Sequence, residues 1–267
     1  KNFILFFVFI CFASNGFGQM LLNQDGEAFT TDPFFNADFI KNNKIKTIKG
    51  AYSFKKNKDL IRKVPGSYTY EFNKKGRLSA CIDIRWNGKT LDTTLQFYEY
   101  NELGTIISLK KSENNGITLQ EFHRDSLNRI ISTSNYRVIL NENDEIVKKN
   151  EMNTETMRYS NEKKTTYNSY NLPYLISYDN YNEDGYKTSS IDKLKMGGTI
   201  YKKKYDYNNK GLLISIETFY DTHPDPVEEL KFKYDGFGNL MERHEFKQGV
   251  FTKDFQVIFD TKTGLLH

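Results

Sequence analysis

One stretch of the sequence gathers side chains that could do acid–base or metal chemistry. The stretch 221–229 contains one histidine, two prolines and four carboxylates: Asp221, His223, Pro224, Asp225, Pro226, Glu228 and Glu229. Carboxylate oxygens suit hard cations, and a glycoside hydrolase needs two carboxyl groups about 5 to 9.5 Å apart. Asp221 and Glu228 would form such a pair if both faced one cleft. The prolines fit equally well with a long hairpin loop between strands, and we predict no metal ligand here.

The other reactive residues are scattered. The four histidines, none in a metal-ligand spacing, are His123, His223, His244 and His267. His244 has carboxylates as close neighbours and could pair with one of them. Cys81 lies in an alternating stretch typical of a buried strand, which favours a packing role over a nucleophilic one. Because phosphate-loop, nucleophile-elbow, zinc-protease and dinucleotide motifs are also missing, we predict no catalytic, cofactor-binding or metal residue.

Tyrosine is the residue type in clear excess, with 18 copies beside 21 phenylalanines. A tyrosine combines an apolar ring with a polar tip, so rows of tyrosine on strands could stack on sugar rings or grip a protein surface. Many of these tyrosines occupy repeated positions, described below, where the fold itself needs them. We therefore expect core packing to account for most of those copies.

Composition narrows the class of protein. The chain has 267 residues, of which 38% are hydrophobic and 15% aromatic, with a formal net charge of +4. These values indicate a globular, aromatic-rich body rather than a disordered chain or one with many membrane spans. Lysine and arginine alternate with aspartate and glutamate instead of forming a basic stripe, so we expect no nucleic-acid partner.

The first 18 residues have the pattern of a secretory signal peptide. Lys1 is followed by an apolar run over 3–13, and Gly16 and Gly18 precede Gln19 as small residues at a cleavage site. The run is far shorter than the roughly 20 residues that span a bilayer. We therefore expect an exported mature chain with no transmembrane segment, located in the periplasm, at the outer membrane or outside the cell. Removal of Cys11 with the signal would leave Cys81 without a disulfide partner.

An internal repeat fills most of the remaining sequence. Four ungapped copies share the frame aromatic, any, aromatic, Asn/Asp, two variable residues, Gly, any, aliphatic. Their turn residues are Asn73 and Gly76, Asn101 and Gly104, Asn208 and Gly211, and Asp235 and Gly238. Weaker copies have their turns starting at Asp125, Asn141, Asn168, Asn182 and Asp260.

Each position of the frame has a mechanical reason in a β-hairpin. Aromatics two residues apart lie on one face of a strand, and an Asn or Asp at the start of a turn bonds back to the backbone. A glycine three residues later supplies the positive φ of a bulged type I turn. The repeat therefore predicts about nine hairpin turns.

These turns predict an all-β fold. We expect an antiparallel meander of repeated hairpins that forms one strongly twisted or curled sheet, either an open shell or a partial barrel. An irregular tail over 19–39 and capping strands over 40–66 would precede the repeat domain at 67–267. An outer-membrane barrel needs an uncharged outward band, which the charged residues on both strand faces disfavour.

The repeat frame resembles that of the YD-repeat or RHS-type proteins. The nearest matches are Tyr205-Asp206-Tyr207 and Tyr234-Asp235 with Gly238, and the resemblance covers about residues 67–267. In that group, long hairpin arrays coil into a hollow β shell that encloses a toxin, or form an extracellular barrel in adhesion proteins. This array is short and lacks the core segment and effector of the shells. It looks more similar to small exported proteins of the Bacteroidetes type.

Together these features favour a non-enzymatic function. We expect an exported β-repeat scaffold that binds an envelope protein or a cell-surface polysaccharide. The alternatives are a glycan hydrolase that uses paired carboxylates and a toxin-associated protein that encapsulates or neutralises its cargo.

Overall fold

A computed structural model describes residues 35–54, 60, 62–161, 163–221, 223–236, 238–256 and 258. The expected signal peptide, nearly all of the expected tail and the turn at Asp260 lie outside these residues. The described elements are α1 (Ala37–Asn42), β1 (Thr47–Phe54), β2 (Arg62–Phe72), β3 (Leu78–Trp86), β4 (Leu91–Tyr100), β5 (Ile106–Glu113), β6 (Gly116–Arg124), β7 (Ile130–Leu140), β8 (Ile146–Ser160), β9 (Lys163–Tyr167), β10 (Pro173–Tyr181), β11 (Lys187–Leu194), β12 (Thr199–Tyr207), β13 (Leu213–Tyr220), β14 (Glu228–Tyr234), β15 (Leu240–Lys247) and β16 (Val250–Gln256).

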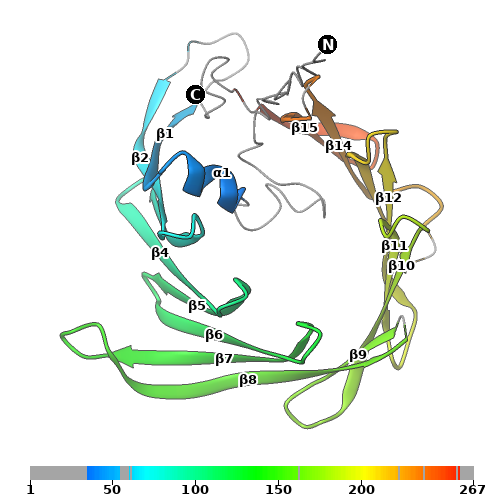
Figure 1. Ribbon diagram of the computed structural model, residues 1–267, viewed down its shortest axis with the longest axis horizontal. Helices are drawn as coiled ribbons and strands as arrows, with labels where there is room; N and C mark the ends of the chain where they lie inside the picture. The colour runs from blue at the N-terminus through cyan, green and yellow to red at the C-terminus, as the bar shows by residue number, and fades with distance from the viewer. Residues whose placement is uncertain are drawn as a thin grey trace, which may run out of the picture.

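The sixteen strands form one antiparallel sheet in which the spatial order equals the sequence order. The expectation of an all-β chain built as a meander of hairpins is confirmed. Within the described residues β1 pairs only with β2, and β16 pairs only with β15, so no strand pairing closes the sheet. In Figure 1 the strands follow one another around a wide arc, with α1 on its inner side.

Eight of the hairpin turns in the array share one geometry. In the turn that begins at Asn73, the Gly76 N–H donates to the Asn73 carbonyl at 2.9 Å, and Asn73 Oδ1 accepts from the Arg77 N–H at 3.1 Å. The fourth residue of each such turn has a left-handed φ, from +56° at Asn171 to +90° at Gly238. The eight described turns of this kind begin at Asn73, Asn101, Asp125, Asn141, Asn168, Asn182, Asn208 and Asp235.

A side chain just before the turn ties several units to the preceding strand, beyond the last pair of the ladder between the two strands. Three tyrosine hydroxyls donate to the carbonyl of the first residue of that strand: Tyr100 to Leu78 at 2.7 Å, Tyr207 to Lys187 at 2.9 Å and Tyr234 to Leu213 at 2.7 Å. Arg124 occupies the same place in its unit, and its Nη2 donates to the Ile106 carbonyl at 3.4 Å. The second aromatic of the repeat thus fixes the end of its strand to the start of the strand that precedes it in the sheet.

A short helix starts the described chain and covers one end of the sheet. Asn36 caps α1, since its Oδ1 accepts from the Phe39 N–H at 3.0 Å. Phe39 and Ile40 are buried against Phe72 and Tyr98 on the inner side of the arc. An irregular tail and capping strands were expected here, because six residues are too few to show a helical period. This helix is not long enough to cross a membrane.

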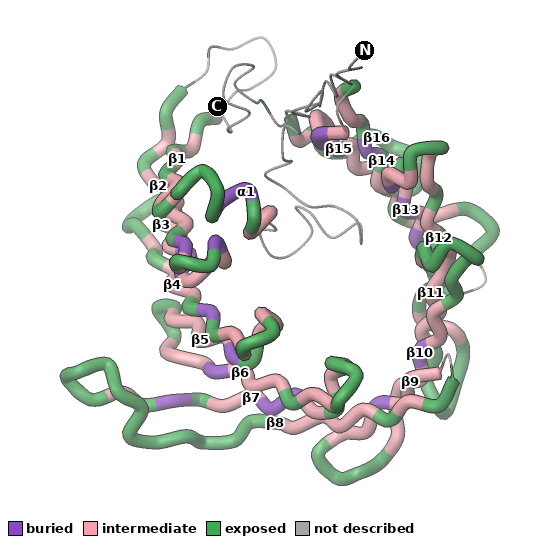
Figure 2. Tube along the Cα trace, in the orientation of Figure 1, coloured by how far each residue is buried: buried purple, intermediate pink, exposed green. Residues whose placement is uncertain are grey.

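The sheet has little second layer, so its core is discontinuous. Figure 2 shows the buried segments as short, separate patches along the arc. Apart from the cluster at α1, a second cluster joins Leu213, Ile216, Phe232 and Leu240. Eleven Lys or Arg side chains of the described residues lie within 6.0 Å of an aromatic ring centroid. The stems of these long cationic side chains cover aromatic faces that a second layer would cover elsewhere.

Candidate functional site

Of the stretch 221–229, the described residues 221 and 223–227 lie in the connection between β13 and β14, and Glu228 and Glu229 begin β14. The Val227 N–H donates to the Thr218 carbonyl at 2.8 Å, and the Gln248 N–H donates to the Val227 carbonyl at 3.0 Å. Gln248 and Gly249 both have positive φ, as a two-residue hairpin turn between β15 and β16 requires. These bonds hold the loop against the neighbouring turn.

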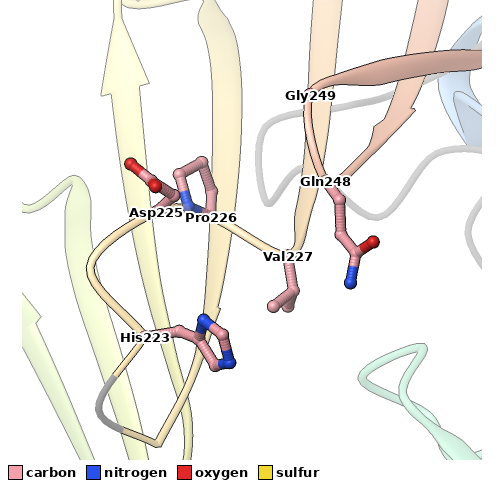
Figure 3. A pocket seen from close by; sticks show the side chains of 6 residues that line it. All are labelled: His223, Asp225, Pro226, Val227, Gln248 and Gly249. Atoms are coloured by element: carbon pink, nitrogen blue, oxygen red, sulfur yellow. The ribbon is translucent and has the colours of Figure 1, made fainter.

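A cavity of about 520 Å³ lies between this loop and that turn. It is lined by His223, Asp225, Pro226, Val227, Gln248 and Gly249. In Figure 3 the side chains of Val227 and Gln248 point toward the space beside His223, whereas the Asp225 carboxylate points away. With one imidazole and one amide directed at it, the cavity offers few polar groups to a ligand.

The structure does not bring the proposed carboxylate pair to this cavity. Asp221 and Glu228 are both absent from its lining. Glu228 Oε1 lies 3.3 Å from Lys247 Nζ on β15, whereas the Asp221 carboxylate lies next to Gly198, on the side of β12. The two side chains therefore contact opposite neighbours, which removes the geometric support for a hydrolase built on them. Among the described residues, no three His, Cys, Asp or Glu side chains lie close enough to hold a metal ion.

His244 contacts two carboxylates and an aromatic ring. Its Nε2 lies 3.2 Å from Glu242 Oε2 and 3.3 Å from Asp254 Oδ1, and its ring meets Phe251 edge-on. A hydrogen bond from Lys233 holds the pKa of Glu242 below its ordinary value. The expected pairing of His244 with a carboxylate is therefore present as a link between strands.

A second cavity, of about 420 Å³, forms a groove across the strands from β4 to β8. This outer groove is lined by Phe97 and Glu99 of β4, Ser108 and Lys110 of β5, Leu119 and Glu121 of β6, and Ile146 and Lys149 of β8. The register places Phe97, Lys110 and Leu119 directly opposite one another. Phe97 is 39% exposed, and Lys110 Nζ lies 5.1 Å from its ring centroid. This row presents an accessible aromatic ring beside a cation.

A second row of the outer groove is polar. Glu99, Ser108 and Glu121 also lie directly opposite one another, and the Ser108 hydroxyl donates to Glu99 Oε2 at 2.6 Å. Glu121 forms an ion pair with Lys149, whose Nζ lies 5.3 Å from the ring centroid of Tyr136. Carboxylates and cations thus stand beside an aromatic ring in one groove.

The groove lies on the outer side of the arc. Side chains alternate along a strand, so Phe97 and Glu99 face away from Tyr98 and Tyr100. Tyr98 packs in the same cluster as Phe39 of α1, which lies on the inner side of the arc. The outer groove is therefore open to large, extended molecules that approach from outside.

Sequence reasoning missed the outer groove. Its residues come from four strands and span 53 positions, and only the strand register brings them together. The alternation of Phe97 with Glu99, Ser108 with Lys110 and Leu119 with Glu121 is visible in the sequence. Combined with the turn at Asn101, which sets the register of Glu99 against Ser108, this alternation could have indicated the two rows.

Known proteins show only weak similarity to this chain. No family model and no curated protein matches the chain. Among solved structures, a porin-like protein from Bacteroides uniformis is 11% identical, with a TM-score of 0.45, over 79% of this chain and 94% of that one. TcdB2-TccC3 without its hypervariable C-terminal region is 14% identical, with a TM-score of 0.26, and the match covers 73% of this chain and 11% of that one. TM-scores this low assign neither a family nor a function.

Proposed function

We propose that this protein is a non-enzymatic β-repeat scaffold that binds an extended polysaccharide in the outer groove. The observation that carries the proposal is the exposed ring of Phe97, which lines the same groove as the carboxylates of Glu99 and Glu121. An aromatic ring can stack on the apolar face of a sugar, while carboxylates accept hydrogen bonds from its hydroxyls. A groove that crosses several strands matches a chain-like ligand better than a small molecule.

The setting of this scaffold is part of the proposal. The signal-peptide pattern of residues 1–18 supports export to the periplasm, the outer membrane or the cell exterior. We propose that the sheet is a curled, open shell of YD-type hairpins with the packed aromatics inside and the charged face outside. On such a shell, a polysaccharide or an envelope protein meets the outer face first.

One observation favours a rival function as a glycan hydrolase. Glu99 and Glu121 flank Ser108, and two interstrand steps place their backbones about 10 Å apart. Carboxylates at roughly 6.5 to 9.5 Å are typical of inverting glycosidases. The ion pair of Glu121 with Lys149 and the hydrogen bond of Glu99 with Ser108 serve equally well to orient both groups for binding.

One experiment separates binding from hydrolysis. The protein is immobilised and probed with a glycan panel and with envelope extract, and every bound glycan is incubated with the protein and assayed for new reducing ends. We expect at least one polysaccharide to bind and no product to form. Product that is lost in both Glu99→Gln and Glu121→Gln would overturn the scaffold proposal in favour of the enzyme. Binding of extract proteins alone, with no glycan bound, would reject the polysaccharide as ligand.

A further inference from the structure

Strand β8 has a free edge in the middle of the array. It pairs with β7 from Ile146 to Thr156, but with β9 only from Thr156 to Ser160. The Thr154 N–H donates to the Ser169 hydroxyl at 2.9 Å, and that hydroxyl donates to the Thr154 carbonyl at 3.1 Å. The stretch 146–153 therefore has no strand on its second side among the described residues.

This free edge is accessible along its whole length. All eight residues of 146–153 are exposed, including the apolar Val147 and Met152, each at 61%. In Figure 1 the hairpin of β7 and β8 extends beyond the arc, away from the other strands. An unpaired strand edge presents a row of backbone donors and acceptors that can pair with another strand.

We infer that the free edge of β8 pairs with the same edge of a second copy of this chain. An antiparallel pair of identical strands has a two-fold axis normal to the sheet, so one residue lies opposite itself. With Asn150 at the axis, Lys149 lies opposite Glu151 of the second copy, and Glu151 lies opposite its Lys149. Two opposite-charge pairs therefore form across the interface.

The neighbouring registers are disfavoured. An axis at Lys148, Lys149 or Glu151 would place two like charges directly opposite each other, which is destabilising. The shift in the β7–β8 register leaves Met152 without a partner on β7, so the regular part of the edge ends at Glu151. Among the registers centred on residues 148 to 151, charge pairing thus favours the one centred on Asn150.

The size of the edge sets the strength of the contact. One pair of short strands buries much less than the roughly 1,600 Å² of a standard interface. The dimer is therefore weak and reversible, with dissociation in the micromolar range or above. It does not depend on the polysaccharide proposal, since the edge exists whether or not the groove binds a ligand.

Variants with reversed charges test the inference. Their dimerisation is measured by sedimentation velocity at protein concentrations from about 1 to 200 µM, around the expected dissociation constant. We expect the parent protein to dimerise as its concentration rises. Glu151→Lys places Lys149 opposite a lysine and leaves the Glu121–Lys149 pair intact, so it weakens the dimer at least tenfold. Lys149→Glu also weakens it, whereas the double variant Lys149→Glu/Glu151→Lys restores opposite charges and the dimer. Lys148→Glu is the matched control, because Lys148 faces Met152 of the second copy.

Two results would overturn the inference. One is a parent protein that stays monomeric at every concentration. The other is a dimer that persists in both single variants or that the double variant fails to restore. Circular dichroism of each variant confirms that the fold is kept, because all three positions are exposed.

Discussion

At the scale of single residues, the turns depend on glycines whose surroundings differ. Gly211 has a φ of +75°, and a Cβ added there would clash with the hydroxyl of Tyr186. Gly185 has a φ of +81°, but nothing lies within 4 Å of where its Cβ would be. The two positions therefore separate backbone strain alone from backbone strain combined with a steric clash.

We expect Gly211→Val to lower the free energy of unfolding by at least about 1 kcal/mol, because a β-branched residue is strained at positive φ. Gly185→Val carries the backbone strain without the clash, so it should cost less than Gly211→Val. Urea denaturation of both variants checks this order. Equal stability of Gly211→Val and the parent would show that the turn geometry is wrong.

A tyrosine hydroxyl that links strands has a measurable share in stability. Tyr100→Phe removes the donor to the Leu78 carbonyl and leaves a buried acceptor without it, which should cost about 1 kcal/mol. Tyr181→Phe is the control, since Tyr181 is 56% exposed. Chemical denaturation of both proteins measures the difference. A Tyr100→Phe variant as stable as Tyr181→Phe would mean that the link does not stabilise the array.

Partly buried tyrosines predict sensitivity to alkali. The pKa of Tyr52, Tyr100 and Tyr174 is raised from 10.0 to about 12 each, by burial first and, at Tyr52 and Tyr174, also by the carboxylates that bond to them. The folded protein thus holds these protons more tightly than the unfolded chain. Their contribution to stability is complete below pH 10 and is lost as the pH rises from 10 to 12.

Denaturation midpoints at a series of pH values from 9 to 12, with absorbance at 295 nm to follow tyrosinate, check this window. We expect stability to fall above pH 10, and a smaller fall in Tyr100→Phe. A midpoint that stays constant up to pH 12 would contradict the raised pKa values.

At the scale of elements, the hairpins were predictable and the helix was not. The hairpin turns follow from local chemistry, because Asn73 and Gly76 specify a turn within four residues. The helix α1 is defined by its Asn36 cap and by contacts with distant strands, and neither leaves a period in six residues. Strand lengths could not be predicted either, since β8 has 15 residues and is longer than the spacing of the turns indicates.

The helix α1 should contribute more to the stability of the fold than its six residues suggest. Ile40 is fully buried between α1 and the sheet, so Ile40→Ala leaves a cavity and should cost about 2 to 5 kcal/mol. Ile139→Ala, at a side chain that is 50% exposed, should cost far less. Thermal unfolding of both variants measures the contrast. An Ile40→Ala variant as stable as Ile139→Ala would show that α1 does not pack on the sheet in solution.

At the scale of the whole molecule, the sequence predicts the class and order of the strands but not the site. The repeat frame accounts for a meander of hairpins, and the outward Lys and Glu side chains account for a solvated face. The outer groove depends on how β8, which lies beyond β7 in the sheet, is placed relative to β4, β5 and β6, because Ile146 and Lys149 complete its lining. That position results from how far the sheet bends, which no local pattern encodes.

The most direct test of the central proposal is calorimetric titration of a polysaccharide from the panel into three proteins. These are the parent, Phe97→Ala and Phe251→Ala, which removes another exposed ring, at 53% exposure, far from the groove. We predict that Phe97→Ala binds at least tenfold more weakly than the parent and that Phe251→Ala binds as the parent does, with no product released from the glycan. Equal affinity of Phe97→Ala and the parent would contradict binding in the outer groove.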